Sequence, residues 1–128
     1  MKIKTTELEG AALDWAVAQC EEEYNEEMIV SISMGGRVNV MIEPDTCYHY
    51  RPSTDWSQCG PLIERYNIHL ECGPLDKVGA QVSWEATVMD FETMTCDSAE
   101  GDTPLVAVCR AVVCGLIGDT VEVPESLL

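Results

Sequence analysis

The chain has 128 residues, 46% of them hydrophobic, and its 23 acidic and seven basic side chains give a formal net charge of −16. This length and composition predict one folded domain over residues 1–128 and exclude a disordered chain. The shortage of Lys and Arg excludes direct binding of nucleic acid, because phosphate contacts need clustered basic side chains. No apolar run reaches the roughly 18 residues of a membrane span, and the N-terminus lacks an apolar signal segment, so we expect a soluble, cytoplasmic protein without membrane partners.

The seven cysteines predict free thiols rather than disulfides or a metal centre. Their number is odd and no two are spaced as Cys-x-x-Cys, whereas a disulfide framework would need an even number and a secretory signal. Cys47 and His49 lie two residues apart, but a closed zinc site needs four ligands in short paired spacings. We therefore expect no metal and no cofactor.

The first predicted element is an amphipathic helix that begins after Thr6. Thr6 and Glu9 have the spacing of a capping box. The apolar side chains that follow recur on one face at helical spacing: Leu8, Ala11, Ala12, Trp15 and Ala16. The acidic run CEEEYNEE over residues 20–27 has no apolar face, so we interpret it as a solvated linker.

The middle of the chain alternates strand and turn signals. Residues 28–33 and 37–42 alternate apolar and polar side chains around Met-Gly-Gly, which predicts a hairpin whose second strand ends at Pro44-Asp45. The remaining predictions for this part of the chain are an ordered loop over 47–59, a short helix over 61–66 that begins at Pro61, strands over 67–72 and 80–91, and a polar loop over 92–101.

The last helix has the strongest local signals. Asp102 or Thr103 is the expected N-cap, Pro104 occupies the first helical position, and Gly118 follows the end. A short extended segment, VEVP, comes after it. Together these elements predict an α+β fold, with an antiparallel sheet of about four to five strands packed against two longer α-helices.

The residues offer little for catalysis. His49 and His69 are the only histidines available as bases near neutral pH. No nucleophile elbow, phosphate-binding loop or dinucleotide fingerprint is present, and carboxylates are so numerous that no pair stands out for acid–base work. The sequence therefore favours a protein without catalytic residues.

Binding chemistry is concentrated in the segment YRPSTDWSQCGPLIER, residues 50–65. Arg51 and Arg65 bracket Trp56; a guanidinium can fork onto a phosphate, and an aromatic ring can stack on a base. Between them lie polar side chains suited to ribose hydroxyls or base edges: Ser53, Thr54 and Asp55. A structural interpretation stays open, in which Asp55 caps a helix, Trp56 fills the core and each Arg pairs with a neighbouring Glu.

Arg110 is a further candidate, because it lies near the edge of the apolar stripe of the last helix. Its cation is either held in a cleft by acids or a ligand, or reaches past the stripe to solvent. The start of that helix could also receive an anion, although Asp102 would oppose it.

Three stretches together resemble the NinX family, small proteins encoded by tailed phages and prophages: LEGAALDWAVA, YRPSTDWSQCGPLIER and GDTPLVAVCRAVV followed by GDTVEVP. The resemblance covers nearly the whole chain and implies a phage-encoded cytoplasmic protein. The family pattern usually reads Gly-Gly-Pro where this sequence has Cys59-Gly60-Pro61. Carried over to this chain, it points to a site at Trp15, Asp55, Trp56, Arg65 and Arg110.

Two hypotheses from different classes follow. The first is a non-enzymatic binder, and a homo-oligomer, that sequesters a nucleotide-derived immune signal as a counter-defence sponge. Its ligand pocket would be lined by Trp15, Tyr50, Ser53, Thr54, Asp55, Trp56, Arg65 and Arg110. The alternative is an acidic interaction protein that inhibits a host nucleic-acid-binding protein by charge mimicry. It would act through Glu21, Glu22, Glu23, Glu26 and Glu27.

Overall fold

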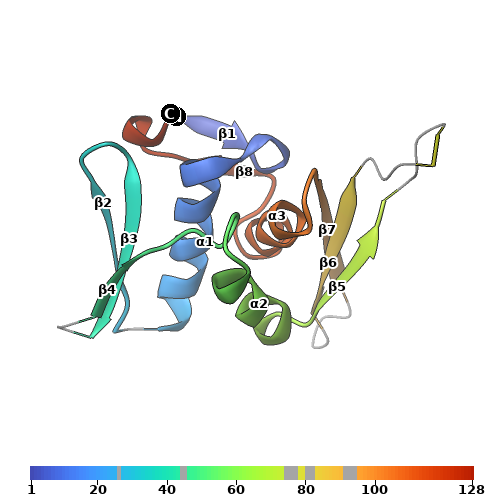
Figure 1. The fold of residues 1–128 in the computed structure, drawn as a ribbon, viewed down its shortest axis with the longest axis horizontal. Helices are drawn as coiled ribbons and strands as arrows, with labels where there is room; N and C mark the ends of the chain where they lie inside the picture. The colour runs from blue at the N-terminus through green and yellow to red at the C-terminus, as the bar shows by residue number, and fades with distance from the viewer. Residues whose placement is uncertain (26, 44–45, 74–77, 80–82, 91–94) are drawn as a thin grey trace.

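The protein is a layer of helices between two small antiparallel sheets (Figure 1). The computed structural model describes residues 1–25, 27–43, 46–73, 78–79, 83–90 and 95–128. In the described part of the chain, three α-helices and eight strands form the fold. The helices are α1 (Gly10–Tyr24), α2 (Trp56–Arg65) and α3 (Pro104–Leu116).

The first sheet has the order β2–β3–β4. It consists of β2 (Ile29–Ser33), β3 (Arg37–Glu43) and β4 (Thr46–His49). The predicted hairpin is confirmed, and its turn uses the positive φ of Gly35 (93°) and Gly36 (78°). Val38 and Val40 are fully buried, and α1 packs on β2 and β3. The strand β4 corrects the predicted loop at 47–59, and Pro44-Asp45 lies outside the described residues.

The helix α1 differs from its prediction at both ends. Residues Thr5–Glu7 form a 3-10 turn, and α1 begins only at Gly10, so the expected capping box at Thr6 is wrong. The helix then continues through the first part of the acidic run to Tyr24, which corrects the solvated linker. The reason is tertiary, because Glu21 is only 6% exposed and packs against α2.

The helix α2 begins at Trp56, five residues before the predicted start at Pro61. Asp55 is its N-cap, and the Asp55 Oδ1 accepts the Ser57 backbone N–H at 2.9 Å. The structural interpretation of Asp55 is therefore confirmed. Cys59 and Leu62 turn inward from this helix and are buried.

The second sheet has the order β5–β6–β7 and lies on the right in Figure 1. It consists of β5 (Ile68–Cys72), β6 (Trp84–Asp90) and β7 (Thr95–Gly101), and α3 packs on β6 and β7. Strand β7 corrects the predicted polar loop over residues 95–101, and residues 92–94 of that loop lie outside the described residues. A Cβ at Gly101 would lie 2.6 Å from the Ala107 backbone nitrogen, so glycine lets α3 approach this strand closely.

The ends of the chain close the top of the molecule. Strands β1 (Lys2–Lys4) and β8 (Thr120–Glu122) form a two-stranded antiparallel sheet, followed by a 3-10 turn at Glu125–Leu127. The α+β class is confirmed, but three small sheets replace the single predicted one, and the predicted short helix is the ten-residue helix α2. Among the described residues, no helix has the length and apolar content needed to cross a membrane.

Candidate functional site

The loop before α2 is held in place by one side chain of that helix. Gln58 Nε2 donates to the His49 carbonyl at 2.9 Å, and Gln58 Oε1 accepts the Arg51 backbone N–H. On the other side, the Tyr50 backbone N–H donates to the Val38 carbonyl at 2.9 Å. The segment that carries most of the predicted site is therefore fixed to both β3 and α2.

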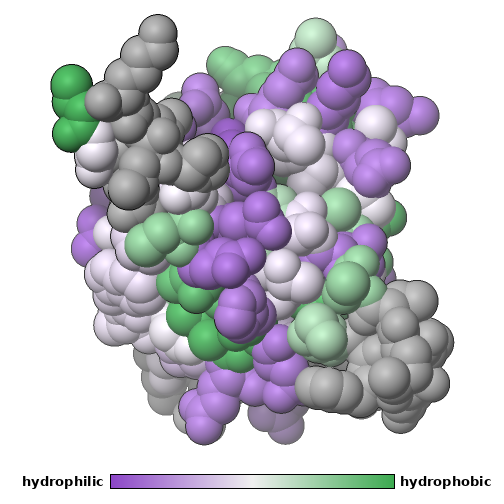
Figure 2. Space-filling view, turned by 90° about the vertical axis from the view of Figure 1, so that its right-hand side faces the viewer, coloured by the Kyte–Doolittle hydropathy of each residue, from purple (hydrophilic) through white to green (hydrophobic). Residues whose placement is uncertain are grey.

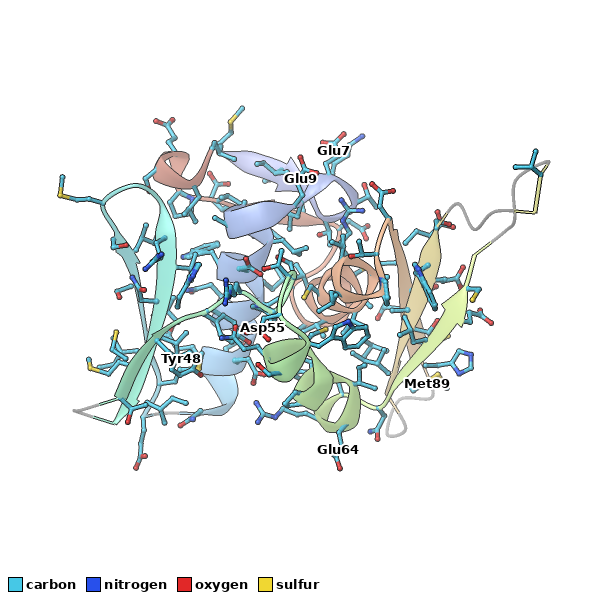
Figure 3. All side chains as sticks on the ribbon, in the orientation of Figure 1. Glu7, Glu9, Tyr48, Asp55, Glu64 and Met89 are labelled. Atoms are coloured by element: carbon cyan, nitrogen blue, oxygen red, sulfur yellow. The ribbon has the colours of Figure 1, made fainter. Side chains whose placement is uncertain are left out.

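A pocket of ≈ 280 Å³ lies where the C-terminal end of α1, the helix α2 and the strands β3 and β4 meet. We call it the tyrosine pocket. Figure 3 shows Tyr48 between β4 and the lower half of α1, and Asp55 at the start of α2. It is lined by Glu21, Asn25, Met28, Ile42, Tyr48, Tyr50, Ser57, Gln58, Pro61 and Arg65.

Two tyrosine rings form one wall of this pocket. Tyr48 and Tyr50 meet edge to face, with ring centroids 6.4 Å apart and an interplanar angle of 64°. Burial, and secondly the nearby Glu21 carboxylate, raise the pKa of both phenols. Both rings therefore stay neutral at physiological pH and keep their O–H groups as donors.

Charge in the tyrosine pocket comes from an ion pair. Arg65 Nη1 donates to Glu21 Oε2, and the Tyr66 hydroxyl donates to the same oxygen at 3.3 Å. The Glu21 side chain is 8% exposed, whereas that of Arg65 is 53% exposed. The Glu21 carboxylate is thus enclosed by its partners, while about half of the Arg65 side chain, which lines the pocket, is exposed.

Ser53 and Thr54, in the loop before α2, make hydrogen bonds within the protein. The Ser53 backbone N–H donates to Asp14 Oδ1 at 2.9 Å, and both residues are buried. Burial raises the pKa of Asp14, and the bonds from Ser53 oppose that rise. The Ser53 hydroxyl makes no hydrogen bond of ordinary geometry with any described residue, although it lies close enough to the Asp14 carboxylate to affect its pKa. Thr54 is exposed, and its hydroxyl donates to the Arg51 carbonyl at 3.4 Å.

The two tryptophans of the predicted site lie apart from the tyrosine pocket. Trp56 is 50% exposed and Trp15 is half-buried against the core. Neither is among the residues that line this pocket. The suggestion that Trp56 fills the core is wrong, and its exposed ring does not supply a stacking surface in the pocket beside Arg65.

Arg110 belongs to a different part of the molecule. Its Nε donates to the Leu8 carbonyl at 2.8 Å and its Nη1 to the Glu100 carbonyl at 3.0 Å. It lines a cleft of ≈ 410 Å³ beside β7. Of the eight predicted residues, Tyr50 and Arg65 share the tyrosine pocket, Arg110 lines the second cleft, and the other five line neither: Trp15, Ser53, Thr54, Asp55 and Trp56.

Several residues that matter here were missed from the sequence. Asp14 is a polar residue between Leu13 and Trp15 in the otherwise apolar first half of α1, which is a signal of a buried hydrogen bond. Glu21 and Tyr48 carry no comparable local signal. Within the described ranges, no group of three or more His, Cys, Asp or Glu side chains could hold a metal ion. Cys59 and Cys109 are fully buried and in side-chain contact, and both are free thiols.

The fold and pocket define a small α+β protein with a helical layer between two sheets and an ion-paired, tyrosine-lined pocket at one side. Residues 4–115 match the family described as bacteriophage P22 NinX. The chain therefore belongs to the NinX family of phage proteins, which confirms the resemblance. No curated protein matches the chain.

Proposed function

We propose that the tyrosine pocket binds a small nucleotide-derived ligand and holds it without chemical turnover. The observation that carries the proposal is the joint presence of Tyr48, Tyr50 and a half-exposed Arg65 around one pocket. Aromatic rings provide a face or edge for a planar base, and the guanidinium can fork onto a phosphate. Because Glu21 is already enclosed, a second anion would contact the exposed part of the Arg65 side chain.

The size of the pocket limits the ligand. Pockets that hold drug-sized ligands have volumes of about 300–1,000 Å³, and the tyrosine pocket, at ≈ 280 Å³, lies just below that range. A base with one sugar or phosphate therefore fits better than a whole dinucleotide, whose second half would remain outside. The net charge of −16 repels anions, so the Arg65 guanidinium is needed to offset that field locally.

The biological role we propose is sequestration. A phage protein that binds a nucleotide-derived immune signal and does not hydrolyse it lowers the free concentration of that signal in the cytoplasm of its host. Each copy removes at most one molecule per pocket, so such a protein acts by stoichiometry and needs high affinity. We propose that it works as a homo-oligomer, which would bring several pockets together.

Isothermal titration calorimetry with mononucleotides, cyclic dinucleotides and cyclic oligonucleotides tests the proposal. Tyr48→Ala and Arg65→Gln should each weaken binding by about tenfold or more, as expected for loss of a charge-assisted hydrogen bond or an aromatic contact. Arg37→Gln is the matched control, because Arg37 is exposed at the start of β3 and does not line the pocket. Binding that is unchanged in Tyr48→Ala and Arg65→Gln, with both variants folded by circular dichroism, would overturn the proposal.

A further inference from the structure

The strand β7 forms an edge of its sheet, and part of its backbone faces a groove. Within the described part of the chain, β7 pairs with β6 alone. The Glu100 carbonyl accepts from Arg110 Nη1, so it points away from β6. Because backbone groups of alternate residues in an antiparallel strand point to the same side, the N–H and C=O of Ser98 also point away from β6. This edge can accept another strand.

The groove beside this edge consists of two clefts that share lining residues. The cleft of ≈ 410 Å³ and a second of ≈ 300 Å³ both include Thr6, Ser98 and Ala99. We call the joined space the edge groove. Arg110 and Cys114, one turn apart on α3, line it from the helix side, while Lys4–Thr6 and Asp119–Thr120 line the side opposite β7.

The charges near the edge groove favour a basic occupant. Glu71, Glu85 and Glu100 are direct cross-strand neighbours on β5, β6 and β7. Like charges directly opposite one another are destabilising, and this row ends at the free edge. Figure 2 faces this side of the sheet and shows hydrophilic side chains over its middle. A strand placed next to β7 with Lys or Arg opposite Glu100 would continue the row with the opposite charge.

A second copy of the chain fits this edge poorly. Natural edge strands are protected from self-pairing by charged side chains, Pro or bulges, and β7, with the sequence TCDSAEG, carries the charged residues Asp97 and Glu100. Antiparallel pairing of two β7 strands would bring these acidic residues close together. The same charges that discourage self-pairing would attract a basic strand.

We propose that an extended basic segment of a partner protein adds to the free edge of β7, with backbone hydrogen bonds at Ser98 and Lys or Arg side chains beside Glu100 and Glu85. The groove ends at Arg110, because the Arg110 guanidinium already donates hydrogen bonds to the Glu100 carbonyl and the Leu8 carbonyl. Strand addition of this kind takes its affinity from the main chain and its specificity from alternate side chains. The site is independent of the tyrosine pocket.

Fluorescence anisotropy with labelled heptapeptides tests this inference. The probes carry Lys or Arg at positions 1, 3, 5 and 7 and Val, Ile or Thr between them. Ser98→Pro removes an N–H that faces the groove while leaving the pairing of Ala99 with β6 in place. We expect it to weaken binding by about tenfold, the loss typical of one hydrogen bond. Glu100→Lys should weaken binding further, whereas Glu122→Lys on β8 and Tyr48→Ala should leave it unchanged.

Peptides with alternate N-methylated amides separate strand addition from charge attraction. Strand addition requires that N-methylation abolish binding and that peptides with Glu in place of Lys fail to bind. Equal binding of methylated and unmethylated peptides, or of Ser98→Pro and the parent protein, would overturn the inference. So would an absence of binding by every basic peptide at low salt, or self-association of the parent protein that Ser98→Pro abolishes.

Discussion

Arg65 on α2 and Glu21 on α1 form an ion pair across 44 residues of sequence, with the Glu21 side chain enclosed and the Arg65 side chain half-exposed. The pair joins two helices and forms the charged side of the tyrosine pocket. It is therefore both a structural contact and the main reason to place an anion there. Its two roles can be separated by mutation.

Arg65→Ala should lower the free energy of unfolding by about 1–2 kcal/mol, because Glu21 would be left enclosed without its cation. The value lies below that of a fully buried pair since solvent already screens Arg65. Urea denaturation measures it. In the double variant Glu21→Gln/Arg65→Ala, part of the loss should be recovered. Equal stability of Arg65→Ala and the parent protein would contradict the structural role.

Asp14→Asn should change the pH dependence of stability. Burial raises the pKa of Asp14 in the folded state above its ordinary 3.8. The protonated Asp14 carboxyl therefore contributes stability that is fully present below pH 3.8 and is lost as the pH rises through the folded-state pKa. Asn keeps an acceptor for the Ser53 N–H and does not ionise. The free energy of unfolding of the variant should therefore rise relative to that of the parent as the pH increases from 3.8 through the folded-state pKa, and the difference should then level off. Urea denaturation at a series of pH values measures this; a variant less stable at pH 7 would argue against it.

Asp55→Ala should lower the melting temperature at neutral pH. Bonds from the Ser57 hydroxyl, and secondly from its backbone N–H, lower the pKa of Asp55. A lowered pKa means that the contribution is present above 3.8 and is lost as the pH falls through the folded-state pKa. Asp55→Ser keeps the cap and should melt close to the parent. A difference between Asp55→Ala and parent that persists unchanged at low pH would show that the carboxylate is not the source.

The elements predicted well from sequence carry their signals locally. Gly35 and Gly36 mark the hairpin turn, and Thr103 followed by Pro104 marks the start of α3, where the Thr103 hydroxyl accepts the Val106 N–H at 3.2 Å. The strand β7 has no such signal, since TCDSAEG lacks β-branched and aromatic residues apart from its first threonine. Its strand conformation depends on pairing with β6 and on the close approach of α3 at Gly101.

The candidate site was predictable only in part, because some of its residues carry no local signal in the sequence. Tyr50 and Arg65 lie in one predicted segment and do line one pocket. Glu21 also lines this pocket, but it lies in an acidic run whose sequence predicts a solvated linker. Only the three-dimensional fold brings Glu21 to Arg65. The family resemblance groups Arg110 with Arg65, but α3 carries Arg110 to the opposite side of the helical layer, beside β7.

The burial of Glu21 also changes the test of the alternative, charge-mimicry hypothesis. Neutralising Glu21 would disturb the ion pair with Arg65, so it cannot report on surface charge alone. Glu22, Glu23 and Glu27 are exposed. The variant that replaces these three with Gln should leave nucleotide binding in the tyrosine pocket unchanged, as measured by calorimetry. Loss of binding would show that long-range charge, not the pocket, controls the ligand.

The cysteines should fall into distinct reactivity groups. Cys47, Cys72 and Cys96 are exposed, Cys114 is partly exposed, and Cys20, Cys59 and Cys109 are buried. Burial, and secondly the Glu23 carboxylate, raise the pKa of Cys20 to about 12, which further reduces its reactivity. Iodoacetamide followed by mass spectrometry should label the exposed group first and the buried group only after unfolding. Early labelling of Cys59 or Cys109 would contradict the packing of α2 against α3.

Native mass spectrometry tests the central claim most directly. The protein is purified from bacterial cells with an active nucleotide-signalling defence, and its mass is compared before and after denaturation. We predict a small nucleotide-derived molecule that is released only on denaturation, is reduced or lost in Arg65→Gln and Tyr48→Ala, and is retained in Arg37→Gln. An unliganded mass for the parent protein under these conditions would contradict the proposed sequestering function.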